Sequence, residues 1–271
     1  MNEAVQASRI EQMLHARSYK GFTEAVQRCI EESLAYMFPC YFTTTDATEG
    51  NPERVRVAFS EAIRCLFDDG DRVKQIIDEL MNRFPSIYAM LLTDIEAAYN
   101  GDPAAENVDE IILCYPAFRA ISIYRIAHEL YLMKLPVIPR AMTENAHRLT
   151  GIDIHPGATI ADHFFIDHGT GVVIGETTVI GSNVKLYQHV TLGAKSFAVN
   201  DDGTLVKGLK RHPNIGNNVV IYAGATILGG NTYIADNSVI GGNVWLTSST
   251  EPGEVVTNGL SHKKKDTRGT V

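Results

Sequence analysis

Five of the nine histidines lie between residues 155 and 212, and carboxylates stand close to them in sequence. The histidines are His155, His163, His168, His189 and His212, and the carboxylates are Asp153, Asp162, Asp167 and Glu176. An imidazole held by a carboxylate can act as a general base, because the carboxylate fixes the ring tautomer and stabilises the protonated ring. The sequence has no G-x-S-x-G elbow and no glycine-rich nucleotide loop. We therefore expect a base-activated substrate group to attack directly, without a covalent acyl-enzyme.

The segment that carries these histidines has a six-residue repeat of aliphatic side chains. Its anchors are Ile154, Ile160, Ile166, Ile174, Ile180, Leu186, Leu192, Ile215, Ile221, Ile227, Ile234, Ile240 and Leu246. A period of six is typical of a hexapeptide β-helix, whereas ordinary alternating strands, the competing interpretation, have a period of two. Three hexads would form one triangular coil, with the aliphatic residues inside and small or polar residues at the corners.

The repeat is interrupted at three places, two of which lie beside histidines. The spacing from Ile166 to Ile174 is eight residues, and an insert of roughly seventeen residues at about 195–211 separates Leu192 from Ile215. A single extra residue falls near Gly229. Long insertions in a regular repeat usually serve function, so we expect the insert to form a wall or lid over a site.

The first half of the chain has helical periodicity instead. Apolar residues recur at spacings of three and four over 22–37, and similar patterns predict helices over about 52–67, 72–83, 86–99, 117–133 and 140–150. Asp71 and Ser86 are candidate N-caps. We predict an α + β protein with an all-helical N-terminal domain at 1–148, a left-handed parallel β-helix at 149–248 and a polar C-terminal tail at 249–271.

Composition and charge limit which partners the protein can bind and which compartment it occupies. The net charge is −8, which does not favour nucleic acid or an anionic membrane as a partner. The sequence starts without the basic and apolar stretches of a signal peptide, and no apolar run approaches the length of a membrane span. The four cysteines have no C-x-x-C spacing, which indicates reduced thiols and no metal site. These features predict a cytoplasmic protein.

Several motifs in the second half resemble the serine O-acetyltransferase signature of the hexapeptide-repeat acyltransferases. These are Asp153-Ile154-His155-Pro156, Asp167-His168-Gly169-Thr170-Gly171, Gly175-Glu176-Thr177, Val190-Thr191-Leu192-Gly193 and Arg211-His212-Pro213. Upstream, Asp102-Pro103-Ala104 and Tyr124-Arg125-Ile126-Ala127-His128 fit the same family. The resemblance covers roughly 100–245 and implies acetyl transfer from acetyl-CoA to the hydroxyl of L-serine, giving O-acetylserine for cysteine biosynthesis.

The resemblance also implies a role for each matching residue. His168 is similar to the general base, and Asp153 is similar to the aspartate that orients it. The implied serine-binding residues are Asp102 and Asp167 for the amino group, Arg211 for the carboxylate, and His212 in the same pocket. A planar guanidinium suits a carboxylate, as this assignment requires. The implied backbone contacts of acetyl-CoA, in a groove between neighbouring subunits, are Gly193, Ala223 and Gly224.

Partners follow from the same resemblance. We expect acetyl-CoA as a co-substrate, with no permanently bound cofactor and no metal, and L-cysteine as a feedback inhibitor in the serine site. A homotrimer, or a hexamer made of two trimers, is implied by the shared groove. Family members that bind cysteine synthase typically end in isoleucine, whereas this sequence ends in Val271, which argues against that complex.

Three alternatives remain open at the level of sequence. His163, His168 and His189 could instead hold zinc, as in enzymes that resemble the γ-class carbonic anhydrases. An acetyltransferase for a sugar or another hydroxyl acceptor would share the same scaffold. A non-catalytic protein that only binds cysteine synthase is the third alternative, although the pair His168 and Asp153 argues against it.

Overall fold

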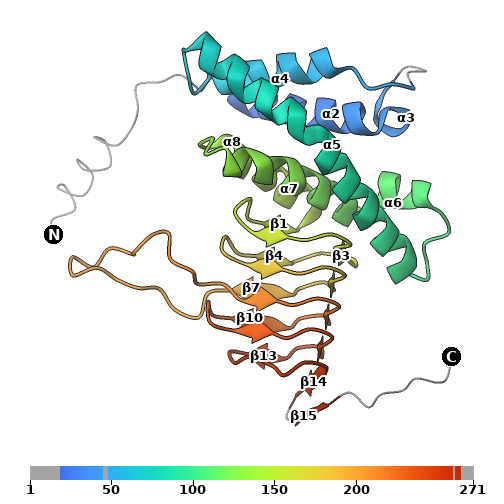
Figure 1. The fold of residues 1–271 in the computed structure, drawn as a ribbon, viewed down its shortest axis with the longest axis vertical. Helices are drawn as coiled ribbons and strands as arrows, with labels where there is room; N and C mark the ends of the chain where they lie inside the picture. Colours follow the sequence, from blue (N-terminus) through green and yellow to red (C-terminus); the bar gives the residue numbers. More distant parts are fainter. Residues whose placement is uncertain (1–18, 45–47, 259, 264–271) are drawn as a thin grey trace.

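The computed structural model describes residues 19–44, 48–258 and 260–263. A group of helices lies at one end and a stack of short strands extends from it (Figure 1). The helices are α2 (Phe22–Met37), α3 (Pro39–Phe42), α4 (Pro52–Arg64), α5 (Gly70–Gly101), α6 (Val108–Cys114), α7 (Pro116–Leu132) and α8 (Ile138–Thr150). Two expectations concern residues outside the described ranges. The lack of a signal peptide was judged from the start of the sequence, and the cysteine synthase complex was judged from Val271.

The helix α5 corrects the prediction of two helices over 72–83 and 86–99. It runs unbroken from Gly70 to Gly101 with Pro85 inside it, because its buried face continues through Phe84 and Ile87 on both sides of the proline. The N-cap is Asp69 and not Asp71, since the Asp69 carboxylate accepts bonds from the amide groups of Asp71 and Arg72. Ser86 is also not a cap, because its hydroxyl donates to the Arg83 carbonyl within α5.

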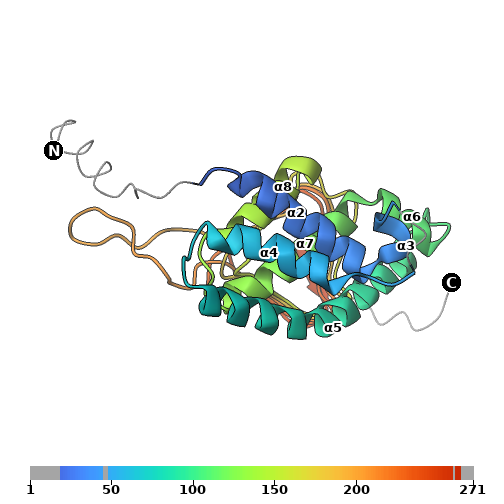
Figure 2. The same cartoon turned by 90° about the horizontal axis from the view of Figure 1, so that it is seen from above.

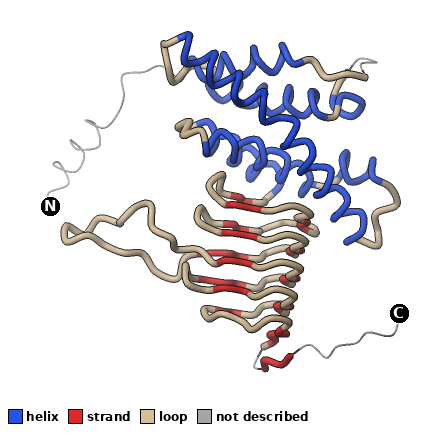
Figure 3. The backbone as a smooth tube through the Cα atoms, in the orientation of Figure 1, coloured by secondary structure: helices blue, strands red, loops and turns tan. Residues whose placement is uncertain are grey.

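The second half forms three sheets, parallel except for the last strand, and they make the faces of a triangular prism (Figure 3). The first face holds β1 (Asp153–Ile154), β4 (Val173–Ile174), β7 (Thr191–Gly193), β10 (Thr226–Leu228) and β13 (Trp245–Leu246). The second holds β2 (Thr159–Ile160), β5 (Val179–Ile180), β8 (Asn214–Ile215) and β11 (Tyr233–Ile234). The third holds β3 (Phe165–Ile166), β6 (Lys185–Leu186), β9 (Val220–Ile221), β12 (Val239–Ile240), β14 (Glu254–Thr257) and β15 (Leu260–Lys263).

The register of these sheets follows the six-residue repeat. Ile154, Ile174 and Leu192 are aligned partners in successive coils, and all three are buried. Each coil therefore stacks its aliphatic anchors on those of the next, as the repeat predicts. Together with the preceding helices, this arrangement confirms the predicted fold class, a helical region followed by a left-handed parallel β-helix.

The corners between strands use left-handed backbone. Asn183, Asn218 and Asn237 have φ between 56° and 64° at one edge of the prism, and asparagine tolerates this region better than most residues. His168 has φ 59° at another edge, in the widened corner between β3 and β4, where Gly169 also has positive φ. The two extra residues of the repeat thus build a corner that pushes one imidazole outward.

Two segments depart from the regular coil. The insert at 195–211 projects sideways from the prism as an arm with one antiparallel bridge, Val199 to Leu205 (Figures 1 and 2). The segment predicted as a polar tail is partly structured, because β14 pairs in parallel with β12 and β15 pairs antiparallel with β14. None of the helices between residues 19 and 258 combines the length and the apolar character of a membrane span.

A buried ion pair joins the helices to the first coil. Arg125 on α7 donates to both carboxylate oxygens of Asp94 on α5, at 2.9 and 2.8 Å, and also to the carbonyls of Ile160 and Ala161. Asp94 in turn accepts the Phe164 amide at 3.0 Å. These bonds hold the strand that leads to Asp167 and His168 against two long helices.

Candidate functional site

The predicted site residues form two groups at different edges of the prism. The first group lies at the edge where β3 turns into β4, which we call the base edge, and contains Asp102, Asp167 and His168. The His168 side chain is 71% exposed, and its Nε2 lies 3.8 Å from Oδ1 of Asp167, which is only 12% exposed. An exposed imidazole beside a nearly buried carboxylate is an arrangement that can take a proton from a bound hydroxyl.

Asp102 is held in place from the helical side. It follows the last residue of α5, and its carboxylate accepts bonds from the Tyr115 hydroxyl at 2.6 Å and from the Ala104 amide at 2.8 Å. The Tyr115 and Ala104 bonds keep the pKa of the Asp102 carboxyl below its usual value, so the group is an anion at neutral pH. Tyr115 was missed by the sequence analysis, since nothing in its spacing links it to Asp102.

The second group lies at the edge where β4 turns into β5, which we call the arginine edge. Arg211, at the end of the insert, pairs through Nη2 with Oε2 of Glu176 at 2.6 Å. Glu176 also accepts the Tyr131 hydroxyl at 3.0 Å. Burial opposes the charged carboxylate, but the bonds from Arg211 and Tyr131 hold the pKa of Glu176 below its usual value. The guanidinium is therefore fixed at this edge and keeps further donors for a carboxylate.

His212 is a neutral ring in this group. Burial, followed by the nearby charges of Arg211 and Lys210, lowers its pKa to about 4. Its Nδ1 accepts the Thr177 amide at 3.0 Å, so the proton of the neutral ring resides on Nε2. A Cβ on Gly175 would lie 2.2 Å from that Nε2, so the ring position requires glycine there. His212 can thus donate a hydrogen bond through Nε2 but is not a cation at neutral pH.

We expect His212 to make the protein less stable in mild acid. Between about pH 4 and 6.5 the unfolded chain binds a proton at this ring that the folded chain does not, so stability falls as the pH falls. His212→Gln should therefore lose about 2 °C less in Tm between roughly pH 7 and pH 4.5 than the wild type. Thermal unfolding followed by circular dichroism measures this, and an identical loss in both proteins would contradict it.

Asp153 does not contact His168 within this chain. It lies on β1, where Arg140 of α8 approaches its Oδ1 at 3.2 Å. Glu144 and His147 stand beside it, and the three acceptor groups are close enough to hold an ion in principle. Arg140 already pairs with both Glu144 and Asp153, which disfavours a cation at the same place. The dyad of Asp153 with His168 stays a prediction.

The residues expected to contact acetyl-CoA lie along the first face of the prism and its base edge. Gly193 ends β7, and Ala223 and Gly224 form the corner after β9, on the same edge as His168 but lower in the stack. Gly224 has φ 73°, and a Cβ there would meet Asn243 of the next coil at 2.3 Å. Tyr187 and Tyr222 stack on this edge with centroids 5.0 Å apart. The path of acetyl-CoA stays a prediction.

The zinc alternative is not favoured by the geometry of one chain. His163 lies at the corner between β2 and β3, a different edge from His168 and His189, and pairs with Asp162 at 3.0 Å. Among the residues described by the structure, the only group with the geometry of a metal site is Glu144, His147 and Asp153. The three histidines therefore do not converge as zinc ligands would.

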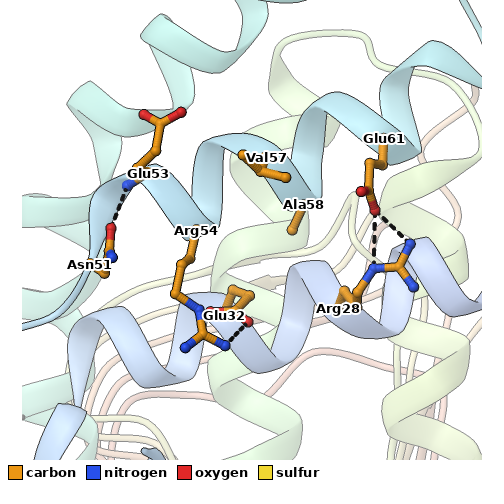
Figure 4. Close-up of a pocket in the computed structure, with 8 residues that line it drawn as sticks. All are labelled: Arg28, Glu32, Asn51, Glu53, Arg54, Val57, Ala58 and Glu61. Carbon is orange, nitrogen blue, oxygen red and sulfur yellow. Dashed lines mark hydrogen bonds and ion pairs between the residues drawn. The ribbon is translucent and has the colours of Figure 1, made fainter.

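A surface pocket lies between α2 and α4 (Figure 4), which are stacked at the end of the molecule away from the strands (Figure 1). Its arginines are already paired, Arg28 with Glu61 at 2.5 Å and Arg54 with Glu32 at 2.6 Å. The other residues that line it are Asn51, Glu53, Val57 and Ala58. Both of its cations are thus neutralised and no imidazole lines it, so we do not assign it a role.

No family model matches the sequence, but individual proteins do. The chain is 49% identical over 209 residues to the Synechococcus elongatus protein "Serine acetyltransferase, plasmid", covering 77% of this chain and 62% of that protein. It is 45% identical over 159 residues to a Helicobacter pylori serine acetyltransferase, covering 59% of this chain and 87% of that protein. The chain spans only 52–62% of the length of three cyanobacterial relatives.

A solved structure agrees with these relatives in fold. The crystal structure of Entamoeba histolytica serine acetyltransferase 1 in complex with L-cysteine matches with a TM-score of 0.78 at 38% identity. The match covers 84% of this chain and 86% of that one, so it includes both the helices and the β-helix.

Proposed function

This chain belongs to the serine acetyltransferase family, and we propose that it transfers the acetyl group of acetyl-CoA to the hydroxyl of L-serine. The observation that carries the proposal is the set of charges at the two edges. Asp102 and Asp167 offer anions for an ammonium, Arg211 offers a cation for a carboxylate, and the exposed His168 stands beside the anions. A zwitterionic amino acid with a hydroxyl side chain matches all of them.

In the proposed reaction, the Nε2 of His168 takes the proton of the serine hydroxyl as the oxygen attacks the thioester carbonyl. The carbon–oxygen bond forms, the carbon–sulfur bond breaks, and the proton returns to the leaving CoA thiolate from the imidazolium. Arg211 and the neutral His212 hold the serine carboxylate, while Asp102 and Asp167 hold the ammonium. This route needs no covalent acyl-enzyme, in line with the absence of a nucleophile elbow from the sequence.

Acetyl transfer is tested by following CoA release with a panel of acceptors at equal concentration. The panel contains L-serine, D-serine, L-homoserine, L-threonine and a hexose. We expect L-serine to give the highest kcat/KM, because both charged groups and the hydroxyl must be placed together. A sugar as the best acceptor would replace this proposal with the other-acceptor alternative, and no release with any acceptor would favour the non-catalytic one.

We also propose that the site is completed by a second copy of the chain. His168 and Arg211 lie on different edges of one prism, so a single serine cannot contact both edges of the same chain. Cyclic trimers are a closed arrangement that would bring the base edge of one chain to the arginine edge of the next. Whether two trimers form a hexamer is a question for mass measurement in solution.

Mixed oligomers test this sharing directly. We expect His168→Asn and Arg211→Ala proteins, each weak alone at low serine, to regain activity when co-expressed as mixed oligomers. In a random mixture about a quarter of the interfaces pair an intact base edge with an intact arginine edge, so roughly a quarter of wild-type activity should return. Mixing already assembled proteins without exchange is the control. No recovery in mixed oligomers would place both residues in a site within one chain.

L-Cysteine is expected to inhibit competitively with L-serine, because only the hydroxyl is exchanged for a thiol. The Entamoeba protein of the same family was solved with L-cysteine. Arg211→Ala should weaken inhibition and raise the serine KM by a similar factor, about tenfold or more, since both ligands share the carboxylate contact. Initial rates over a matrix of serine and cysteine concentrations measure both. Equal rates with and without millimolar cysteine would contradict the shared site.

The remaining partner predictions belong to the same proposal. Acetyl-CoA is the co-substrate, with no permanently bound cofactor. The cysteine synthase complex is not part of the proposal. A cytoplasmic location is supported by Cys29, Cys40, Cys65 and Cys114, all of which are free thiols.

A further inference from the structure

Lys185 is a half-buried cation on the third face of the prism, beside the base edge, and no motif pointed to it. It lies on β6, in register with Phe165 of β3, and its side chain is 18% exposed. Its ammonium lies over the rings of Phe165 and Tyr187, at 5.0 and 4.5 Å from their centroids. Burial opposes the charge, but the contacts with Tyr187 and Asp167 raise the pKa of Lys185, so it stays protonated.

The ammonium of Lys185 contacts one oxygen of Asp167 and leaves the other free for the site. Nζ lies 3.1 Å from Oδ2 of Asp167. Oδ1 of the same carboxylate is the atom that lies 3.8 Å from the His168 imidazole. A carboxylate held by one oxygen cannot rotate freely, so Oδ1 keeps facing the base and the space where an acceptor would bind.

The same ammonium also fixes the second carboxylate of the base edge. Nζ donates to the carbonyl of Gly101 at 2.7 Å, and Gly101 directly precedes Asp102. The end of α5 comes down beside β3 at this point (Figure 1). A Cβ on Gly101 would lie 2.9 Å from the Phe165 ring, so glycine permits this close approach. Lys185 thus contacts both the backbone segment that leads to Asp102 and the Asp167 side chain.

We propose that Lys185 is a positioning residue that sets the spacing of Asp102 and Asp167 for the substrate ammonium. This inference rests on the proposed function. Two carboxylates and one lysine leave a net charge of −1, which matches the single ammonium of an amino acid. Lys185 acts through Asp167 and Asp102 and not by touching the acceptor, because its ammonium is already engaged with the Gly101 carbonyl and Asp167.

Lys185→Met tests the proposal because methionine fills similar space without a charge or a donor. We expect the serine KM to rise about tenfold with kcat and the acetyl-CoA KM changed less than about threefold. The direction of the change in the serine KM is diagnostic. Loss of the Lys185 charge would by itself strengthen binding of the substrate ammonium and lower the KM, so a raised KM must come from lost positioning of the carboxylates. Lys185→Arg, which keeps a charge that reaches Asp167, should recover part of the loss. The control is Lys74→Met on the exposed face of α5.

A double-mutant cycle with Asp167→Asn shows whether Lys185 acts through that carboxylate. In the Asp167→Asn background, Lys185→Met should change the serine KM by less than about twofold, because the partner it positions is gone. The same tenfold change in both backgrounds, or a lowered serine KM, would overturn the proposal, as would wild-type kinetics for Lys185→Met. If Lys185→Met does not fold, the cycle with Lys185→Gln decides. An active wild type with an unaffected variant refutes only this inference, whereas a wild type inactive on serine refutes both.

Discussion

His168→Asn is expected to lower kcat by about 10²–10⁴-fold while the protein keeps its fold. The reason is that Nε2 of His168 is the proposed proton acceptor, and the Asn side chain is too weak a base to replace it. Asparagine is preferred over alanine for this test because residue 168 has φ 59°, which asparagine adopts at low cost. His168→Ala should show the same loss of kcat together with a small loss of stability.

The measurement is CoA release at saturating serine and acetyl-CoA, alongside the thermal unfolding of each variant. His163→Asn is the matched control, since His163 has a similar left-handed backbone with φ 53° at a different edge. It should keep kcat within about threefold, because its ring contacts Asp162 and no part of the proposed site. Retention of most activity by His168→Asn would remove the base assignment and leave His189, on the same edge, as the next candidate.

The six-residue repeat was enough to predict the β-helix, because each anchor has a single inward position in a coil of fixed size. The widened corner at His168 could also be predicted from the eight-residue spacing. The helical half was harder. A proline normally interrupts a helix, yet Phe84 and Ile87 are both buried and keep α5 continuous across Pro85. Periodicity describes which residues face the core but not how far a packed helix will continue.

The sequence predicted which charged residues belong to the candidate site, but not which other residues hold them in place. Asp102 and Asp167 belong to recognisable motifs, whereas Tyr115 and Lys185, which contact them from distant elements, belong to none. Lys185 is eighty-four residues from the Gly101 carbonyl to which it donates. Such partners are set by how the end of α5 packs on the third face, and no local pattern encodes that packing. Residue types therefore pointed to the candidate charged groups but not to the groups that orient them.

Arg125→Met is expected to lower the free energy of unfolding by about 3–5 kcal/mol, because it leaves the carboxylate of Asp94 buried without its cation. The side chains of Arg125 and Asp94 are 6% and 3% exposed, so water cannot replace the lost partner. The exposed Arg83, which pairs with Glu79 and Glu129, is the matched control. Arg83→Met should cost no more than about 1 kcal/mol.

Urea unfolding at one fixed protein concentration measures both variants, and the double variant Arg125→Met with Asp94→Leu shows where the cost arises. It should recover part of the loss, since no buried charge is left, but not all of it. The carbonyls of Ile160 and Ala161 and the amide of Phe164 would still lack the partners that the pair supplies. Equal losses for Arg125→Met and Arg83→Met would show that water reaches Asp94. A large loss with partial recovery would mean that the pair ties the first coil, and with it the strand leading to His168, to α5 and α7.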